Sequence, residues 1–259
     1  MLIEENSPLR RLPTNLNPRQ SQFLDGIRFT VEMADLAYER LKDHLLTLAG
    51  LGVNDPRILA PLPFLYAWSM IDSVHRLRGL VDSLPGLARR NQSPEFRNFM
   101  EKAQTVEQFR NAVQHMDTEI PRSAEAGKAV WGTLSWLRGE ANQPILYTCM
   151  LVGGAMMPGG RHAFINPAGL QFAPPIDHIT LTLAEVPVNL TDLLSGSARL
   201  VRGLETSLAA AFEQFPDRAG SDLLIALAVQ PGANAEEPNI AQAAQAEQTR
   251  EIELGKAEE

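Results

Sequence analysis

Residues Thr105–Ile120 of this chain have the sequence TVEQFRNAVQHMDTEI. Thr105 and Gln108 have the spacing of a capping box, so we expect a helix that begins at Thr105. The apolar residues that follow keep the three- and four-residue spacing of one helical face. They are Val106, Phe109, Val113, Met116 and Ile120.

The polar residues of this expected helix lie away from its apolar face. At about 100° per residue, Asn111 and His115 share one side as an i,i+4 pair. Arg110 lies at the boundary between the two faces, and its long side chain can carry the guanidinium toward His115. The pattern therefore predicts a helix that holds an arginine, an asparagine and a histidine outside its own core.

Other helices are expected before this one. Apolar residues alternate four and three apart over about 20–48, which favours a long helix packed within a bundle over a free coiled coil. Residues 1–19 contain three prolines and few periodic apolar residues, so we expect an extended segment there. Ser93 and Pro94 form a helix start, and this helix is expected to be short and to end near Gln104.

A second long helix is expected from about Pro61 to Leu84. Within it, Asp72 has the spacing for i,i+3 and i,i+4 contacts with His75 and Arg76.

After Pro121 the pattern changes from helical spacing to alternation. We expect antiparallel strands at about 130–136, 145–152 and 178–186, with a Gly/Pro-rich loop at 153–175. A helix is expected at 189–215, capped by Asn189 or Thr191. A short last strand is expected at 222–229. Residues 231–259 are rich in alanine, glutamine and glutamate, which predicts a disordered or weakly helical acidic tail. The predicted fold class is α+β, mainly α.

Composition indicates an ordinary globular protein. The chain has 259 residues, of which 44% are hydrophobic and 21% charged, which is enough for an ordinary hydrophobic core. We expect one domain over 20–230. Its helical core is expected at 20–120 and 189–215, with a β elaboration at 128–186. Its one cysteine, Cys149, excludes an intramolecular disulfide. Since the sequence has neither a signal-like segment nor an apolar run of about 18 residues, we expect a cytoplasmic protein without a membrane partner.

The charge is unevenly distributed. Residues 231–259 contain seven acidic and two basic side chains, a net charge of −5, so the rest of the chain carries −3 of the total −8. Within that body, residues 75–115 contain seven basic and four acidic side chains. Such a stretch can attract phosphate, although the bulk charge argues against non-specific binding of nucleic acid.

The motifs of several common enzyme and cofactor classes are absent from the sequence. There is no GxGxxG, P-loop, GxSxG, HExxH or paired-cysteine motif, and the histidines do not cluster. We therefore expect no metal and no cofactor.

Arg110, Asn111 and His115 form the pattern Arg-polar-x3-His on a helix that follows two longer ones. In this the sequence resembles the HEPN superfamily, helical proteins marked by an arginine, a polar residue directly after it, and a histidine after four to six intervening positions. The resemblance covers residues 20–120 and the 189–215 helix. It implies an HEPN-like antiparallel helical bundle, with the small antiparallel sheet as an elaboration.

The resemblance implies a metal-independent endoribonuclease that acts as a homodimer with a composite site. His115 is then the general acid or base, Arg110 stabilises the phosphate, and Asn111 orients His115 or contacts phosphate. Asp72, His75 and Arg76 are candidates for a supporting or substrate-binding role. The implied product is a 2′,3′-cyclic phosphate, and the implied partners are RNA and an antitoxin or regulatory protein, as for a toxin or phage-defence effector.

Three alternatives stay open at this point. One is a non-catalytic HEPN-like dimer that binds a nucleotide, RNA or a partner protein. Another is that the β segment carries the function while the helices dimerise. The third is a plain surface helix on which Asn111 and His115 bond each other or water, with Asp72 in a simple salt bridge to Arg76.

Overall fold

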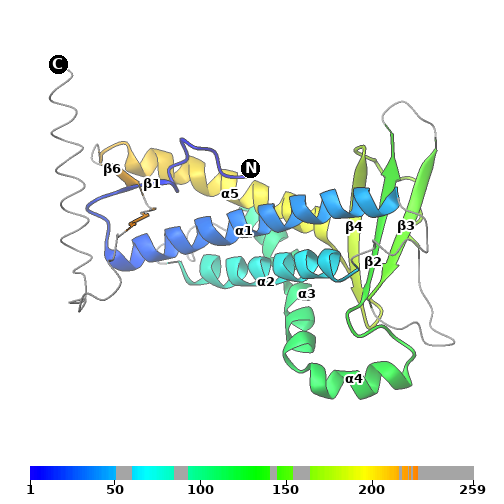
Figure 1. The fold of residues 1–259 in the computed structure, drawn as a ribbon. Coiled ribbons are helices and arrows are strands. Elements are labelled where there is room, and N and C mark those ends of the chain that lie inside the picture. The colour runs from blue at the N-terminus through cyan, green and yellow to red at the C-terminus, as the bar shows by residue number, and fades with distance from the viewer. Residues whose placement is uncertain are drawn as a thin grey trace, which may run out of the picture. The chain divides into compact units, whose positions relative to one another are not determined.

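The computed structural model describes residues 1–50, 60–84, 93–140, 145–153, 164–215, 218–220, 222 and 224–226. The chain divides into two compact units, Met1–Ala219 and Gly220–Glu259. The helices and the larger sheet all belong to the first unit (Figure 1). Three predicted features lie wholly or partly outside the described residues: residues 154–163 of the 153–175 loop, most of the 222–229 strand, and the 231–259 tail.

The described ranges contain five helices and six strands. The helices are α1 (Pro18–Ala49), α2 (Pro61–Ser83), α3 (Pro94–Gln114), α4 (Met116–Glu125) and α5 (Leu190–Phe212). The strands are β1 (Arg11–Pro13), β2 (Thr133–Gly139), β3 (Leu146–Val152), β4 (Ile176–Leu183), β5 (Val186–Asn189) and β6 (Arg218–Gly220). The short strands β1 and β6 pair with each other.

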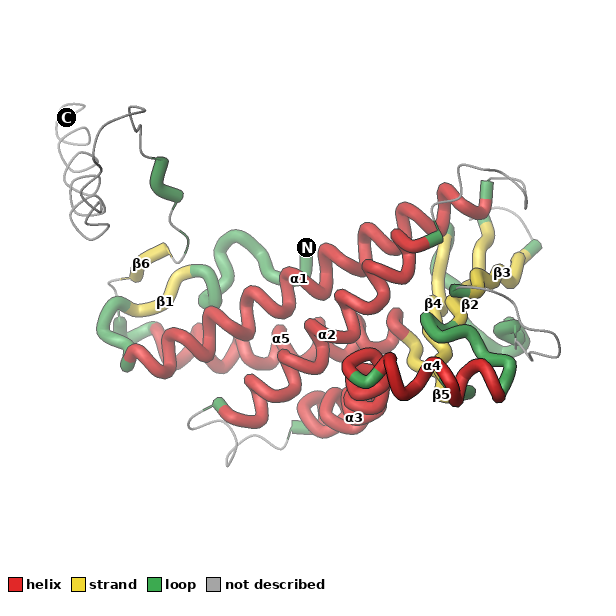
Figure 2. The backbone as a smooth tube through the Cα atoms, turned by 60° about the horizontal axis from the view of Figure 1, so that its bottom comes forward, coloured by secondary structure: helices red, strands yellow, loops and turns green. Residues whose placement is uncertain are grey.

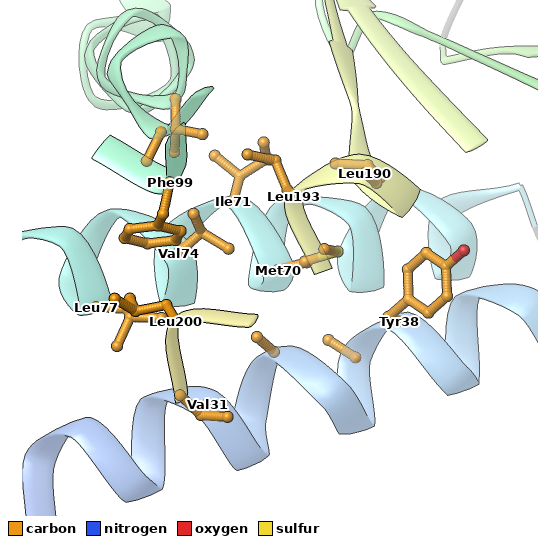
Figure 3. Packing of buried hydrophobic residues seen from close by; sticks show 14 of the residues in the cluster. Val31, Tyr38, Met70, Ile71, Val74, Leu77, Phe99, Leu190, Leu193 and Leu200 are labelled. Atoms are coloured by element: carbon orange, nitrogen blue, oxygen red, sulfur yellow. The ribbon is translucent and has the colours of Figure 1, made fainter. Parts of the chain in front are cut away.

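The helical core forms where α1, α2, α3 and α5 face one another. α1 and α2 run side by side, α3 lies against α2 and α5, and α5 lies beside α1 (Figures 1 and 2). Buried apolar side chains from all four helices meet in one cluster (Figure 3). Val31 of α1, Val74 of α2, Phe99 of α3 and Leu200 of α5 are representative of it. Burial of these faces is the main stabilising contribution to the bundle.

The larger sheet is antiparallel, with strand order β3-β2-β4-β5, and lies at one end of the bundle (Figure 1). Its central strand β2 pairs with both β3 and β4, and Leu134 is opposite Leu151 on one side and Leu181 on the other. Leu134 and Leu181 are fully buried. The sheet therefore shares the hydrophobic core of the helices.

A chain of hydrogen bonds joins the sheet to the bundle. The Tyr38 hydroxyl of α1 lies 2.8 Å from the Thr191 hydroxyl of α5. The Thr191 hydroxyl accepts the backbone N–H of Ile179 in β4 at 3.0 Å. Asn189, the last residue of β5, accepts the Asp192 N–H at 3.0 Å and so caps α5. Because β5 runs directly into α5, the sheet fixes where that helix starts.

Much of the predicted architecture is confirmed. The fold is mainly helical with a small antiparallel sheet, and α1, α2 and α5 start and end within three residues of their predicted bounds. The strand β5 was missed, because Val186–Asn189 follows β4 after a turn of only two residues. The 1–19 segment also contributes buried Ile3, Leu9 and Leu12 to the core, which its prolines did not indicate.

The predicted helix start at Thr105 is wrong. α3 runs without a break from Pro94 to Gln114, so Thr105 lies in its interior. The N-cap is Ser93, whose hydroxyl accepts the Phe96 N–H at 3.2 Å. Tertiary packing explains the difference, because Phe99, Ala103, Val106 and Phe109 form one continuous buried face that crosses the expected boundary.

Candidate functional site

Asp72 of α2 carries a carboxylate that lies between two arginines. Its Oδ1 is 3.8 Å from Nε of Arg110, on the last turn of α3, and its Oδ2 is 2.6 Å from Nη2 of Arg76, one turn along α2. The Arg110 side chain is 38% exposed and the Asp72 side chain 40% exposed. Asp72 therefore holds two guanidinium groups at the surface where α2 meets α3.

A second ion pair joins the same two helices. Nη1 of Arg78 on α2 donates to Oε2 of Glu107 on α3 at 2.9 Å. Together with Asp72, Arg76 and Arg110, these residues make up what we call the α2–α3 charged cluster. With three arginines and two carboxylates, the cluster has an excess of one positive charge at neutral pH.

His75 lies partly buried within reach of the cluster's charges. Burial, followed by the positive charge of Arg110, lowers the pKa of His75 below its ordinary value, while Glu107 and Asp72 act in the opposite direction. Its Nδ1 is buried and has no hydrogen-bond partner among the described residues. The imidazole is therefore favoured in its neutral form beside Arg110.

The packing of two aromatic side chains explains why the cluster forms. The rings of Trp68 and Phe109 are 5.9 Å apart between centroids, which fixes the last turns of α3 against α2. Asp72 follows Trp68 by one helical turn, and Arg110 directly follows Phe109. Asp72, one turn from Trp68, lies on the same face of α2 as this contact. Arg110, the neighbour of Phe109, points to the side of the contact, where its guanidinium lies 3.8 Å from Oδ1 of Asp72.

His115 is not on the helix face where the sequence placed it. It terminates α3 with φ −113° and ψ 37°, and α4 begins at the next residue (Figure 2). Its backbone carbonyl accepts the N–H groups of Thr118 and Glu119, each at 3.0 Å, and so starts the new helix. Its ring is exposed and has no hydrogen-bond or ion-pair partner in the described part of the chain.

The expected Asn111–His115 side-chain pair is therefore not formed. The two residues are linked only through the backbone, where the His115 N–H donates to the Asn111 carbonyl at 3.1 Å, and the Asn111 side chain is exposed. Arg110 pairs with Asp72 and not with His115. The structure thus brings Asp72, Arg76 and Arg110 together beside His75, and leaves Asn111 and His115 at the open end of α3.

The expected salt bridge from Asp72 to Arg76 is present. Arg78 and Glu107 form a separate ion pair, and the sequence did not assign either residue to a site. Their pairing crosses from one helix to another, so no spacing within either helix could have indicated it. Arg78 had only its place in the basic stretch of 75–115 as a signal.

Neither a metal site nor a membrane-spanning helix is found in the ranges that the structure describes. No three histidine, cysteine, aspartate or glutamate side chains come together there as a metal ion requires. None of the described helices combines the length and the apolar character needed to cross a bilayer. Comparison with family models, curated proteins and solved structures finds no significant match to this chain.

Proposed function

We propose that this chain is a metal-independent endoribonuclease of the HEPN type that acts as a homodimer. One observation supports the proposal most strongly: Arg110 is held at the surface by Asp72, and five residues later His115 ends the same helix with a ring that no described residue engages. Five helical residues correspond to about 7.5 Å along the axis, close to the length of one nucleotide unit. A phosphate binder and a proton-transfer group thus lie within reach of a single RNA segment.

The chemistry follows from these two side chains. In RNA cleavage the ribose 2′-oxygen attacks the adjacent phosphorus and the bond from phosphorus to the 5′-oxygen breaks. His115 takes the proton of the 2′-hydroxyl or supplies one to the departing 5′-oxygen, and imidazole is the side chain that enzymes use most often for such proton transfers. Arg110 stabilises the negative charge that accumulates on the phosphate oxygens in the transition state. The products are a 2′,3′-cyclic phosphate and a 5′-hydroxyl.

A dimer supplies what one copy lacks. The reaction needs a base at one oxygen and an acid at the other, and each chain offers one exposed His115. Two copies related by a two-fold axis place two such histidines and two Arg110 side chains around one phosphodiester. The exposed end of α3, with Asn111 beside it, is the surface that we assign to this contact.

The decisive experiment is RNA cleavage with a divalent-metal chelator present. Wild type, Arg110→Ala and His115→Ala are purified in parallel and incubated with labelled single-stranded and structured RNAs. Each variant is expected to lose at least about 100-fold in rate, since general acid–base groups and charge-stabilising donors contribute that much. Mass spectrometry of the fragments should show cyclic phosphate ends.

Two controls come from the same chain. Arg97→Ala removes an exposed arginine from the other end of α3, and His44→Ala removes a histidine whose ring lies against Tyr66. Both are expected to cleave like wild type. Equal cleavage by all five proteins, or none by wild type over varied RNAs, would contradict the proposal.

A second candidate is a dimer that binds RNA or a nucleotide without cleaving it. The observation in its favour is that the cluster brings His75, not His115, under the influence of Arg110. Binding that depends on Arg110 and Arg76, without any cyclic-phosphate product, would support it. Including His75→Gln in the cleavage assay also tests whether His75 takes the role assigned to His115.

A further inference from the structure

The strand β3 forms one edge of the larger sheet. Among the described strands its only neighbour is β2, and it is the outermost strand of the order β3-β2-β4-β5 (Figure 1). All seven of its residues, Leu146–Val152, pair with β2 in one unbroken register. β3 is therefore a long and regular edge strand, and one of its sides has no strand beside it in the described part of the chain.

Two hydrogen bonds show which backbone groups of β3 point outward. The Gly153 N–H donates at 3.0 Å to the carbonyl of Gly132, which lies opposite it when the register is continued by one residue. At the other end Gly139, opposite Leu146, directs its N–H away from β3, to the Pro175 carbonyl at 3.1 Å. Opposed residues in antiparallel strands alternate between bonded and unbonded pairs, so the odd-numbered residues of β3 bond to β2. The N–H and C=O groups that point outward are those of Leu146, Thr148, Met150 and Val152.

The outward edge of β3 lacks the features that usually prevent edge strands from pairing. No described residue bonds to its outward backbone groups. Residues 145–153 contain neither a charged residue nor a proline, which are common protective residues at sheet edges. β5, at the opposite edge, is only four residues long, has Pro187 as its second residue and runs directly into α5. One edge of the sheet is thus protected, and the other carries no such protection.

The side chains along β3 fit a second copy of the same strand. If two β3 strands pair antiparallel over their full length, the two-fold axis passes through the middle residue, Cys149. Exposed Tyr147 of one copy then lies opposite partly buried Leu151 of the other, and every outward N–H finds a carbonyl. Because β3 carries no charge, this pairing brings no like charges together.

From the unpaired outward groups, the missing edge protection and this self-complementarity, we propose that β3 pairs antiparallel with β3 of a second copy of the chain. The pairing joins two four-stranded sheets into one continuous sheet. It does not rest on the proposed ribonuclease activity, because it concerns the sheet and not the end of α3. If copies also meet at the end of α3, the two contacts together give assemblies larger than a dimer.

The first test uses Cys149, the one cysteine of the chain. On the two-fold axis it faces its own copy in an unbonded pair, where Cα atoms lie about 4.5 Å apart, close enough for a disulfide. Oxidation of wild type with copper–phenanthroline is expected to give a covalent dimer that dithiothreitol reverses. The control is Tyr147→Cys combined with Cys149→Ser. Position 147 is more exposed, but its copy lies about 14 Å away, so no crosslink is expected there.

Thr148→Pro tests the pairing without the cysteine. Because the Thr148 N–H points outward, proline there removes no bond to β2, and edge strands accept proline at such positions. Sedimentation equilibrium should show the dissociation constant of the β3 contact raised at least about tenfold, since two symmetry-related hydrogen bonds are lost.

Two lysine variants complete the design. Thr148→Lys places a charge on the exposed edge, should weaken association to a similar degree, and keeps the test informative if the proline variant does not fold. Leu36→Lys, at a 60% exposed apolar position on α1, is the control and should associate like wild type.

Four results would overturn the inference. They are no Cys149 crosslink in wild type, as when the chain's own residues cover the edge; equal crosslinking at positions 147 and 149, as random collisions would give; unchanged association in Thr148→Lys; or a larger loss in Leu36→Lys than in Thr148→Lys, which would place the contact on α1.

Discussion

Asp72 and Arg110 approach each other across the α2–α3 contact, with Oδ1 of the first 3.8 Å from Nε of the second. Both side chains are more than a third exposed, so the pair itself stabilises the fold by no more than about 1 kcal/mol. The pair matters because it determines where the Arg110 guanidinium lies and which group already occupies it. A phosphate that binds Arg110, as proposed, must compete with the Asp72 carboxylate for the guanidinium.

Replacing Asp72 with asparagine is therefore expected to tighten RNA binding about two- to fivefold at low salt, which corresponds to a competing ion pair of roughly 0.5–1 kcal/mol. The charge change should also make binding more salt-dependent, since two arginines become available to phosphate. Fluorescence anisotropy of a labelled RNA at two salt concentrations measures both effects. Asp82→Asn, at an exposed position near the end of the same helix, is the control for one lost negative charge. Weaker binding in Asp72→Asn would instead show that Asp72 orients Arg110 for the ligand.

The lowered pKa of His75 predicts how stability depends on pH. Burial and Arg110 make the folded protein bind a proton at His75 less tightly than the unfolded chain does. Above the ordinary pKa of 6.5, His75 is neutral in the folded and the unfolded chain and does not affect the free energy of unfolding. As the pH falls below 6.5 toward the lowered folded-state pKa, the unfolded chain binds the proton first, so the free energy of unfolding decreases.

His75→Gln should accordingly lose less stability than wild type between pH 7.5 and pH 5.5, as measured by chemical denaturation. Arg110→Gln removes the second cause of the shift and should give an intermediate result. An unchanged pH dependence in His75→Gln would contradict the assignment.

Replacing Ser93 and Thr105 with alanine should have opposite effects on the stability of the fold. Ser93 is the true N-cap, so Ser93→Ala is expected to cost about 1 kcal/mol. Thr105 is inside the helix, where alanine has the higher propensity, so Thr105→Ala should be neutral or stabilise by up to about 0.5 kcal/mol. Thermal unfolding of both variants decides the point. A larger loss at Thr105 than at Ser93 would mean that a helix does start at Thr105.

Two glycines form a similar pair. Gly132 has φ +84°, and a Cβ there would lie 2.6 Å from the carbonyl oxygen of Thr182, so Gly132→Ala should destabilise by about 1–3 kcal/mol or more. Gly203 lies inside α5, where a Cβ meets no atom within 4 Å, so Gly203→Ala should stabilise by about 0.5–1 kcal/mol. Denaturant midpoints measure both changes, and a destabilised Gly203→Ala would contradict the structure of α5.

The periodic apolar residues made the long helices predictable. In α1, Ile27, Val31 and Tyr38 keep the heptad spacing, and all three are buried in the structure. Asn189 was predictable as a cap because its side chain carries the capping oxygen and an apolar helical stripe follows it. These features depend on neighbours in the sequence, which a single chain displays directly.

The arrangement at the end of α3 could not be predicted in the same way. A capping box at Thr105 is a local preference of about 1 kcal/mol, and burial of Phe99 and Phe109 on one continuous face outweighs it. The break at His115 follows for a related reason, because α4 carries exposed Ile120 and has little core to pack against. Arg110 was identified from the sequence, but its partner Asp72 lies on another helix. The sequence indicated contacts of Asp72 only with residues of its own helix.

The direct passage from β5 into α5 has a consequence for how this protein can be dissected. Asn189 is both the last strand residue and the helix cap, and Thr191 binds groups of α1 and β4 at the same time. Deleting residues 128–186 would remove the strands that pack beside Asn189 and expose the apolar surface that Leu134 and Leu181 cover. It would also remove Ile179, whose backbone N–H bonds to the Thr191 hydroxyl that contacts Tyr38. The sheet is therefore part of the same folded unit as the helices, and the roles of the two are better separated by point variants than by deletion.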